Sequence, residues 1–172
     1  MITVDEYYRM AATGVLAPDA KVELLDGEIV EMAPIGSPHA ACVMRLTRRL
    51  WATIGDRALL SVQGPLRLDE HSEPEPDVML LRHRDDTYAA AHPGPDDVLL
   101  LVEVADASAK LDRTRKVPMY LAAGVPEVWL VDLQARTIDA FRGGTAQTYR
   151  AGATIAPQAF PDIGFEVAYL LV

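Results

Sequence analysis

The chain has 172 residues, of which half are apolar and 24% are charged, and its formal net charge is −9. The length predicts a single domain over residues 1–172, and the composition excludes a disordered, collagen-like or coiled-coil protein. No apolar run reaches the roughly 18 residues of a membrane span, and the N-terminus lacks the pattern of a secretory signal. The single cysteine, Cys42, excludes an internal disulfide framework and fits a reducing compartment, so we expect a cytoplasmic protein without a membrane partner.

The first third of the chain predicts a helix, a β-hairpin and a second helix. Residues 4–12 have the pattern of a short helix. Asp26 and Gly27 separate the two strands of the hairpin, 21–25 and 28–32, because a two-residue type I′ turn needs positive φ at both positions. Apolar residues recur at helical spacing over residues 39–54 and predict the second helix.

The middle of the chain changes to the period of two that is typical of strands. Residues 58–68 predict a strand that is bent at Gly64 and Pro65, and residues 74–81 predict a second strand. The charged segment 82–97 is expected to be a loop with a short helical turn at 88–91. Since strands that follow each other in sequence are often neighbours in the sheet, the strand at 74–81 is expected to lie beside the next strand, 98–105.

The next segment, 98–105, is almost continuously apolar, as in a strand covered on both faces. A helix is predicted over 112–123, although Pro118 lies inside it and has no N–H, so either its first turn is kinked or the regular helix begins nearer Val117. Further strands are predicted at 128–131, 137–141 and 147–150, and the tail 155–172 is expected to cover the core. This order predicts an α/β fold with a central mixed β-sheet flanked by helices.

Glu103 is the most informative residue for chemistry, because it interrupts the apolar strand. A carboxylate is costly to bury unless it is protonated, paired with a base or bound to a metal, so a salt bridge to an Arg or Lys and a metal site both remain open. Asp77 precedes the apolar end of the neighbouring strand and would otherwise be an ordinary strand-entry residue. Two carboxylates on adjacent strands repel each other, and a hard cation such as Mg²⁺ would relieve that repulsion.

Lys116 shares one helix face with Asp112 and Tyr120 at spacings of four residues, which is also compatible with a solvated lysine paired with Asp112. Of the four histidines, only His39 stands at a helix start, where a capping or packing role is the alternative to a site role. With one cysteine and no close histidine pair, a zinc site is not expected.

Several motifs together resemble the Uma-type family, a large bacterial group of restriction endonuclease-like proteins within the PD-(D/E)XK nuclease superfamily. The resemblance runs from about residue 3 to residue 142. It is carried by segments 23–30 and 37–39, by Pro76-Asp77, by Glu103-Val104-Ala105, by Asp112, Lys116 and Tyr120, and by segment 124–132.

The resemblance implies a restriction endonuclease-like core in which Asp77 and Glu103 are metal ligands. The superfamily usually has a lysine two residues after the glutamate, where this chain has Ala105, and in the Uma-type pattern a lysine on the next helix takes its place. That lysine matches Lys116 and not Lys110. The family also tends to have an acid at Glu23, whose alternative is an exposed hairpin position, and a histidine at His39.

The expected function is therefore a Mg²⁺- or Mn²⁺-dependent endonuclease that hydrolyses DNA phosphodiester bonds, with Asp77, Glu103 and Lys116 as catalytic residues. The acidic net charge disfavours DNA binding and keeps a non-catalytic binding or assembly module open. A metal-dependent hydrolase of a small phosphorylated substrate is a third hypothesis. The sequence does not fix the oligomeric state, and a homodimer is compatible with it.

Overall fold

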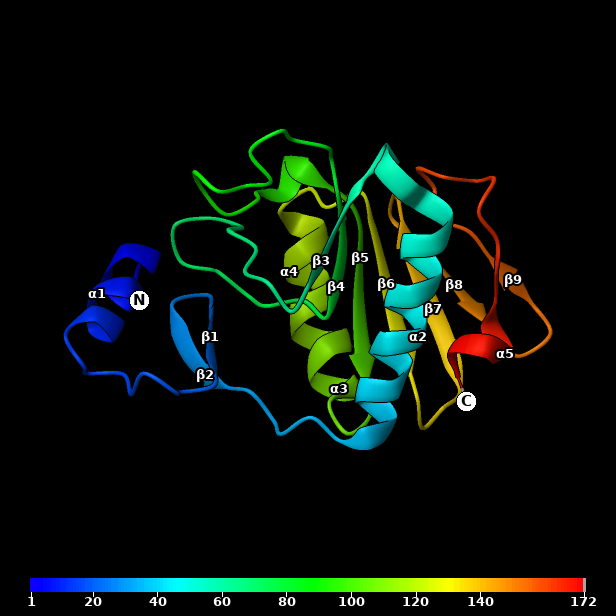
Figure 1. Ribbon diagram of the computed structural model, residues 1–172. Helices are drawn as coiled ribbons and strands as arrows, with labels where there is room; N and C mark the ends of the chain where they lie inside the picture. Colours follow the sequence, from blue (N-terminus) through cyan, green and yellow to red (C-terminus); the bar gives the residue numbers. More distant parts are fainter. Residues whose placement is uncertain (172) are drawn as a thin grey trace.

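A computed structural model describes residues 1–171 and places a six-stranded mixed sheet at its centre (Figure 1). The strand order is β3-β4-β5-β6-β7-β8, with β5 and β6 parallel and the other neighbours antiparallel. The strands are β3 (Leu59–Val62), β4 (Val78–Leu81), β5 (Val98–Ala105), β6 (Glu127–Asp132), β7 (Thr137–Arg142) and β8 (Thr145–Tyr149). The predicted α/β class with a central mixed sheet is confirmed.

Each face of the sheet buries its own hydrophobic core. On one face lie α2 (Ser37–Ile54) and the C-terminal part of the chain, with β9 (Thr154–Ile155), β10 (Phe165–Glu166) and α5 (Val167–Leu170). Trp129 is fully buried in this core against Phe165, as expected of a packing residue. The tail thus covers the core as predicted, over its described residues.

The opposite face is covered by a helical segment that departs from the prediction of one helix over 112–123. It begins with α3 (Ala109–Leu111), widens into a π-helical turn at Asp112–Lys116, and continues as α4 (Val117–Ala122). In the π-turn the Val117 N–H bonds to the Asp112 carbonyl, five residues back. A regular helix would bring the ring of Pro118 against the carbonyl of Thr114, and the wider turn avoids that clash. The expected start of the regular helix near Val117 is confirmed.

The N-terminal region forms a separate layer at one end of the sheet (Figure 1). The helix α1 (Val4–Ala12) starts at a capping box between Thr3 and Glu6. The hairpin consists of β1 (Val22–Leu25) and β2 (Glu28–Glu31), and its turn residues Asp26 and Gly27 have φ of 50° and 74°. The helix, the hairpin and the type of turn are as predicted.

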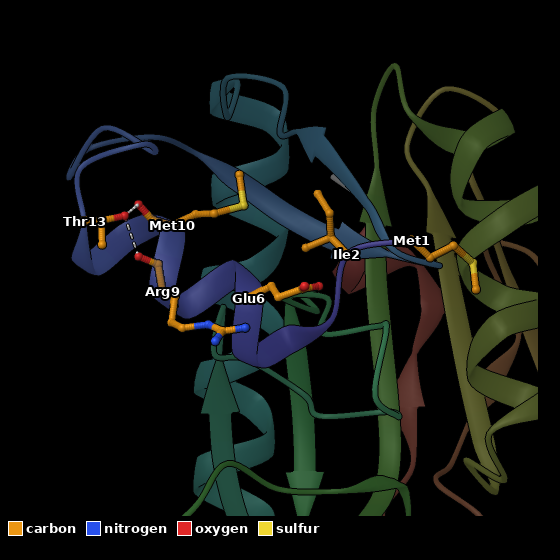
Figure 2. Close-up of a pocket in the computed structure, with 6 residues that line it drawn as sticks. All are labelled: Met1, Ile2, Glu6, Arg9, Met10 and Thr13. Carbon is orange, nitrogen blue, oxygen red and sulfur yellow. Dashed lines mark hydrogen bonds between the residues drawn. The ribbon is translucent and has the colours of Figure 1, made fainter.

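An open hollow of about 460 Å³ lies beside α1 (Figure 2). Glu6 and Arg9 are the charged residues of its lining, and the Glu6 carboxylate already accepts hydrogen bonds from the N–H and hydroxyl of Thr3. The hollow therefore brings together no cluster of reactive side chains.

Three local predictions are wrong. Of the strand expected over 74–81, only β4 (Val78–Leu81) forms. The strand expected over 58–68 ends at Val62, and Leu66 and Leu68 lie beyond it in irregular chain, although both are buried in the core under α4. The alternation of apolar residues in this segment reflects the burial of their side chains and not pairing with another strand. The helical turn expected at 88–91 is instead a turn at 85–88, where Thr87 and Tyr88 have positive φ.

Short 3₁₀ helices at Gly55–Arg57 and Pro95–Asp97 lead into β3 and β5. Across residues 1–171, none of the helices has the length and apolar character needed to cross a membrane.

Candidate metal centre

Glu103 lies on β5, and Asp77 is the residue immediately before β4 (Val78–Leu81). The antiparallel register pairs Val78 with Val102, so the chain enters β4 from Asp77 next to Glu103. Glu103 projects to the face covered by α4, because Leu101, two residues away on β5, belongs to that core and because Glu103 contacts Lys116 and Tyr120. The register agrees with the predicted juxtaposition of the two carboxylates.

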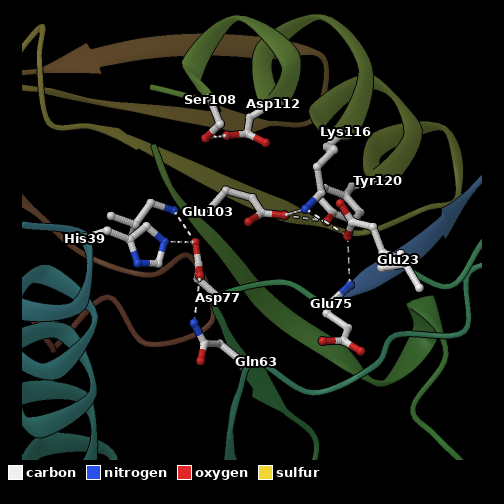
Figure 3. A network of polar contacts seen from close by, with 12 residues as sticks. Glu23, His39, Gln63, Glu75, Asp77, Glu103, Ser108, Asp112, Lys116 and Tyr120 are labelled. Carbon is white, nitrogen blue, oxygen red and sulfur yellow. Dashed lines mark hydrogen bonds and ion pairs between the residues drawn. The ribbon is translucent and has the colours of Figure 1, made fainter. Parts of the chain in front are cut away.

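Asp77 is oriented by two contacts, one with β5 and one with α2. Its Oδ2 accepts a hydrogen bond from the backbone N–H of Val104 at 2.9 Å and lies 3.0 Å from His39 Nε2 (Figure 3). His39 comes from the first turn of α2, and its bond to Asp77 raises the pKa of the imidazole. Within the described chain, His39 Nδ1 is buried without a hydrogen-bond partner. The structure therefore places His39 beside Asp77 rather than at a helix cap.

Glu103 is almost fully buried, with an exposed fraction of 3%. Its Oε1 lies 2.8 Å from Lys116 Nζ and accepts a hydrogen bond from the Tyr120 hydroxyl at 2.5 Å. Burial raises the pKa of Glu103 to about 8, even though Lys116 acts in the opposite direction. Of the two possibilities that the sequence left open, the contact with a basic side chain is present, and it involves the same lysine that the resemblance assigns to the site.

Lys116 stands between two carboxylates. Besides Glu103, its Nζ lies 3.2 Å from Glu23 Oε2, and its exposed fraction is 6%. Burial lowers the pKa of Lys116, but the carboxylates of Glu103 and Glu23 more than offset this, so the pKa is raised and the ammonium stays charged. Lys110 lies exposed in α3. The predicted approach of Lys116 to Glu103 is thus confirmed.

Glu23 reaches the cluster from the hairpin. It is buried in β1, and its Oε2 also accepts a hydrogen bond from the backbone N–H of Glu75 at 3.2 Å. The Arg115 guanidinium holds the hairpin against the π-turn by donating to the Leu25 carbonyl and the Glu28 carboxylate, at 2.9 and 2.7 Å. The exposed hairpin position that was the alternative for Glu23 is therefore not what the structure shows.

Three further residues in this region carried no predicted role. Tyr120 contacts Glu103, and its position on the predicted face of Lys116 was a signal for it. Asp112 is buried in the π-turn, where burial raises its pKa and the Ser108 hydroxyl donates to its Oδ2 at 2.7 Å. Gln63, at the end of β3, points its amide toward Asp77 (Figure 3), and no motif in the sequence indicated it.

The two carboxylates fit a hard divalent cation. Asp77 Oδ2 and Glu103 Oε1 each have two partners, whereas Asp77 Oδ1 has only a 3.5 Å contact from Gln63 and Glu103 Oε2 accepts no described hydrogen bond. Among residues 1–171, no group of three or more His, Cys, Asp or Glu side chains has the arrangement of a metal site. Mg²⁺ is commonly held by one or two carboxylates, with water and substrate phosphate as the remaining ligands, so this donor set suits it and does not suit zinc.

We compared the chain with known protein families and solved structures. A family model described as Uma2, "Putative restriction endonuclease", matches residues 4–168. The chain belongs to this family. Its fold is similar to the crystal structure of a "putative nuclease belonging to DUF820" from Anabaena variabilis, with a TM-score of 0.78 and 14% identity, over 99% of this chain and 98% of the other. No curated protein matches the chain.

Proposed function

We infer that this Uma2-family protein is a Mg²⁺- or Mn²⁺-dependent hydrolase of DNA phosphodiester bonds. The observation that carries the inference is the position of Asp77, at the entry to β4, near Glu103 on the neighbouring strand β5, with the Lys116 ammonium 2.8 Å from Glu103. Paired carboxylates beside a buried ammonium suit a site that handles a cation and an anionic phosphate together. The family description supports a nuclease, and DNA is the substrate that a restriction endonuclease cleaves.

Asp77 and Glu103 would hold the cation through Oδ1 and Oε2, the oxygens with few protein partners. Bound there, the ion would polarise a phosphate oxygen and lower the pKa of a coordinated water. His39 and the Val104 N–H fix the rotation of the Asp77 carboxylate, and Tyr120 and Lys116 fix that of Glu103. The chain thus presents the two oxygens in a set orientation.

Lys116 is suited to stabilise charge and not to act as a general base. Its pKa is raised, so it has no free lone pair with which to accept a proton. Glu23 holds the ammonium from the hairpin side at 3.2 Å and keeps it in place if Glu103 turns toward a cation. We assign Lys116 to negative charge that grows on the phosphate during hydrolysis.

The two lysines near Glu103 give a matched test. Full-length protein is incubated with Mg²⁺ or Mn²⁺ and with supercoiled, linear duplex and single-stranded DNA. Lys116→Ala should abolish cleavage, and Lys110→Ala should leave it nearly unchanged, because Lys110 is exposed on α3. Lys116→Ala leaves two buried carboxylates without their partner and is expected to lower stability. Asp77→Asn, which spares the ion pair, is therefore the second inactivating variant.

Cleavage by Lys116→Ala or Asp77→Asn protein at the wild-type rate would show that the catalytic assignment is wrong. If the wild-type protein cleaves no DNA across metals and salt concentrations, the nuclease proposal fails, and a binding or assembly module becomes the better interpretation of the fold.

A further inference from the structure

Gln63 extends the row of polar residues that crosses the sheet. The β3–β4 register pairs Val62 with Val78, and the backbone N–H of Gln63 donates to the Asp77 carbonyl at 3.1 Å, which continues the pairing by one residue. Gln63 follows the end of β3, Asp77 precedes β4, and Glu103 lies on β5. Figure 3 shows the Gln63 amide directed at the Asp77 carboxylate, which lies between Gln63 and His39.

The backbone of Gln63 has an unfavourable conformation. Its φ is +51°, in the left-handed region, where glycine is at ease and a residue with a long side chain is strained. The chain leaves the sheet at this residue and turns through Gly64 and Pro65. Strained residues of this kind cluster at functional sites, where the side chain is needed in spite of the cost. Glycine would make the same turn without that cost, so the turn by itself does not require glutamine.

The side-chain amide is not needed to hold Asp77. The Gln63 side chain is exposed, and its Nε2 lies 3.5 Å from Asp77 Oδ1, longer than an ordinary N–H···O hydrogen bond. Val104 and His39 already orient the carboxylate through closer contacts at 2.9 and 3.0 Å. The amide therefore stands beside the proposed metal oxygen with donor capacity to spare.

The negative charge around the site is the reason why a spare neutral hydrogen-bond donor is useful there. Besides Asp77 and Glu103, the carboxyl groups of Glu23, Glu75 and Asp112 belong to this region, and the Lys116 ammonium is buried between two of them. A phosphate that approaches from the exposed side meets mostly acceptors. A neutral amide next to Asp77 can donate to a phosphate oxygen without being captured by a carboxylate as an ion pair.

We propose that the Gln63 amide donates a hydrogen bond to a non-bridging oxygen of the substrate phosphate when a cation is held by Asp77 and Glu103. This rests on the proposed function and adds a substrate-binding residue to it. Because the N–H side of the amide faces Asp77, we assign Gln63 to the phosphate and not to the metal, so metal affinity should not depend on it.

Two substitutions separate the amide from the backbone strain. Gln63→Ala removes the amide and keeps a strained residue, whereas Gln63→Gly removes both. Arg136→Gly is the matched control, because Arg136 also has a left-handed backbone, with φ of +55°, and is exposed in the turn between β6 and β7, outside the site. Each protein is measured for thermal stability, Mn²⁺ affinity and cleavage of DNA.

We expect both Gln63 variants to cleave DNA roughly 10- to 100-fold more slowly, the range for one hydrogen bond to a charged group, while their Mn²⁺ affinity stays within about twofold of wild type. Gln63→Gly should have a higher melting temperature than Gln63→Ala. Arg136→Gly should have a higher melting temperature than wild type and should cleave DNA at the wild-type rate. Cleavage by Gln63→Ala within about twofold of wild type would overturn the proposal. So would a parallel loss of cleavage and Mn²⁺ affinity.

A second assay keeps this inference separate from the proposed function. Thymidine 5′-phosphate is titrated into Mn²⁺-loaded protein that has been shown to cleave no DNA. Binding by wild type, with roughly tenfold weaker binding by Gln63→Ala, would support the phosphate contact even though the nuclease proposal had failed. Equal binding by the two proteins, or no binding by wild type, would overturn the contact.

Discussion

At the scale of single residues, the protonation of Glu103 links the site to stability. Burial raises the pKa of Glu103 from 4.5 to about 8, and Lys116 keeps Glu23 as a partner when Glu103 takes up a proton. At a pH between these two pKa values, the Glu103 carboxyl is protonated in the folded protein and ionised in the unfolded chain. The stabilising contribution of this group is therefore complete below pH 4.5 and is lost as the pH rises through 8.

Glu103→Gln should remove this dependence, because the amide is neutral at every pH and keeps the volume of the side chain. In metal-free protein, the free energy of unfolding of the variant should rise relative to that of wild type, by up to about 1.4 kcal/mol per pH unit between roughly pH 5 and 8. Urea unfolding in EDTA at several pH values measures this, and Mn²⁺ titration should show weaker binding. A loss of about 3–5 kcal/mol at pH 7 would instead show that Glu103 is ionised in a structural salt bridge.

The residues of the site were predictable to different degrees. Glu103 was recognisable because a carboxylate inside an apolar strand is costly to bury without a partner. Asp77 was then selected because it lies on the neighbouring predicted strand. Burial of Glu23 could not be predicted, since a short hairpin can dock with either face inward. Gln63 carried no signal, because its meaning depends on a backbone angle and on a cross-strand register that no local pattern encodes.

At the scale of elements, Arg115 connects the hairpin to the helical face. It lies in the π-turn next to Lys116, and its hydrogen bonds to Leu25 and Glu28 hold β1 and β2 where Glu23 meets the ammonium. Its ion pair with Asp26 is longer, at 3.7 Å, and Asp26 is exposed, so that contact contributes little. One side chain from the turn that also presents Lys116 thus contributes to docking of the hairpin, beside backbone hydrogen bonds such as those from Gly27 to His71 and from Glu73 to Leu24.

Arg115→Ala should loosen the hairpin selectively. We expect a loss of about 1–2 kcal/mol in the free energy of unfolding and faster hydrogen exchange in residues 22–31, because a carbonyl and a carboxylate lose their donor. Arg84→Ala is the control, since Arg84 contacts Asp86 and the ring of Tyr88, both within four residues of it in a surface turn. Unchanged exchange in the hairpin would mean that the Glu23–Lys116 pair and the bridge between Leu24 and Glu73 suffice to hold it.

Elements with strong periodicity were predicted almost to the residue, and the misses share a cause. β5 and α1 were found at their observed bounds. β5 is apolar and buried along almost its whole length, whereas α1 buries only Val4 among its described residues. The π-turn was indicated only as a conflict at Pro118, since propensity cannot say how a helix absorbs a proline. The strand predicted over 58–68 was too long, because Leu66 and Leu68 are buried by tertiary packing. Such packing can bury every second residue without hydrogen bonding to a neighbouring strand.

At the scale of the whole molecule, electrostatics set how DNA can be bound. The chain has 25 acidic residues against 16 lysines and arginines, so the long-range field repels phosphate. α2 carries arginines and no acid, and Arg48 and Arg49 on it are exposed, but Arg57 beyond its end is paired with Asp162. Under the proposed function, DNA binding would therefore depend on a few local contacts and on a cation that neutralises the cluster of carboxylates.

This balance predicts an unusually weak salt dependence of DNA binding. Each phosphate that a protein cation neutralises contributes about −0.9 to the slope of log K against log salt, so two or three contacts give a slope of about −2 to −3. The slope is measured by fluorescence anisotropy of a labelled duplex, with Ca²⁺ replacing Mg²⁺ to hold the complex, and the same titration in EDTA should show almost no binding. A slope of −6 or steeper, or equal binding in EDTA, would mean that DNA meets an extended basic surface, which this acidic chain would have to build by another route, such as pairing the α2 faces of two copies.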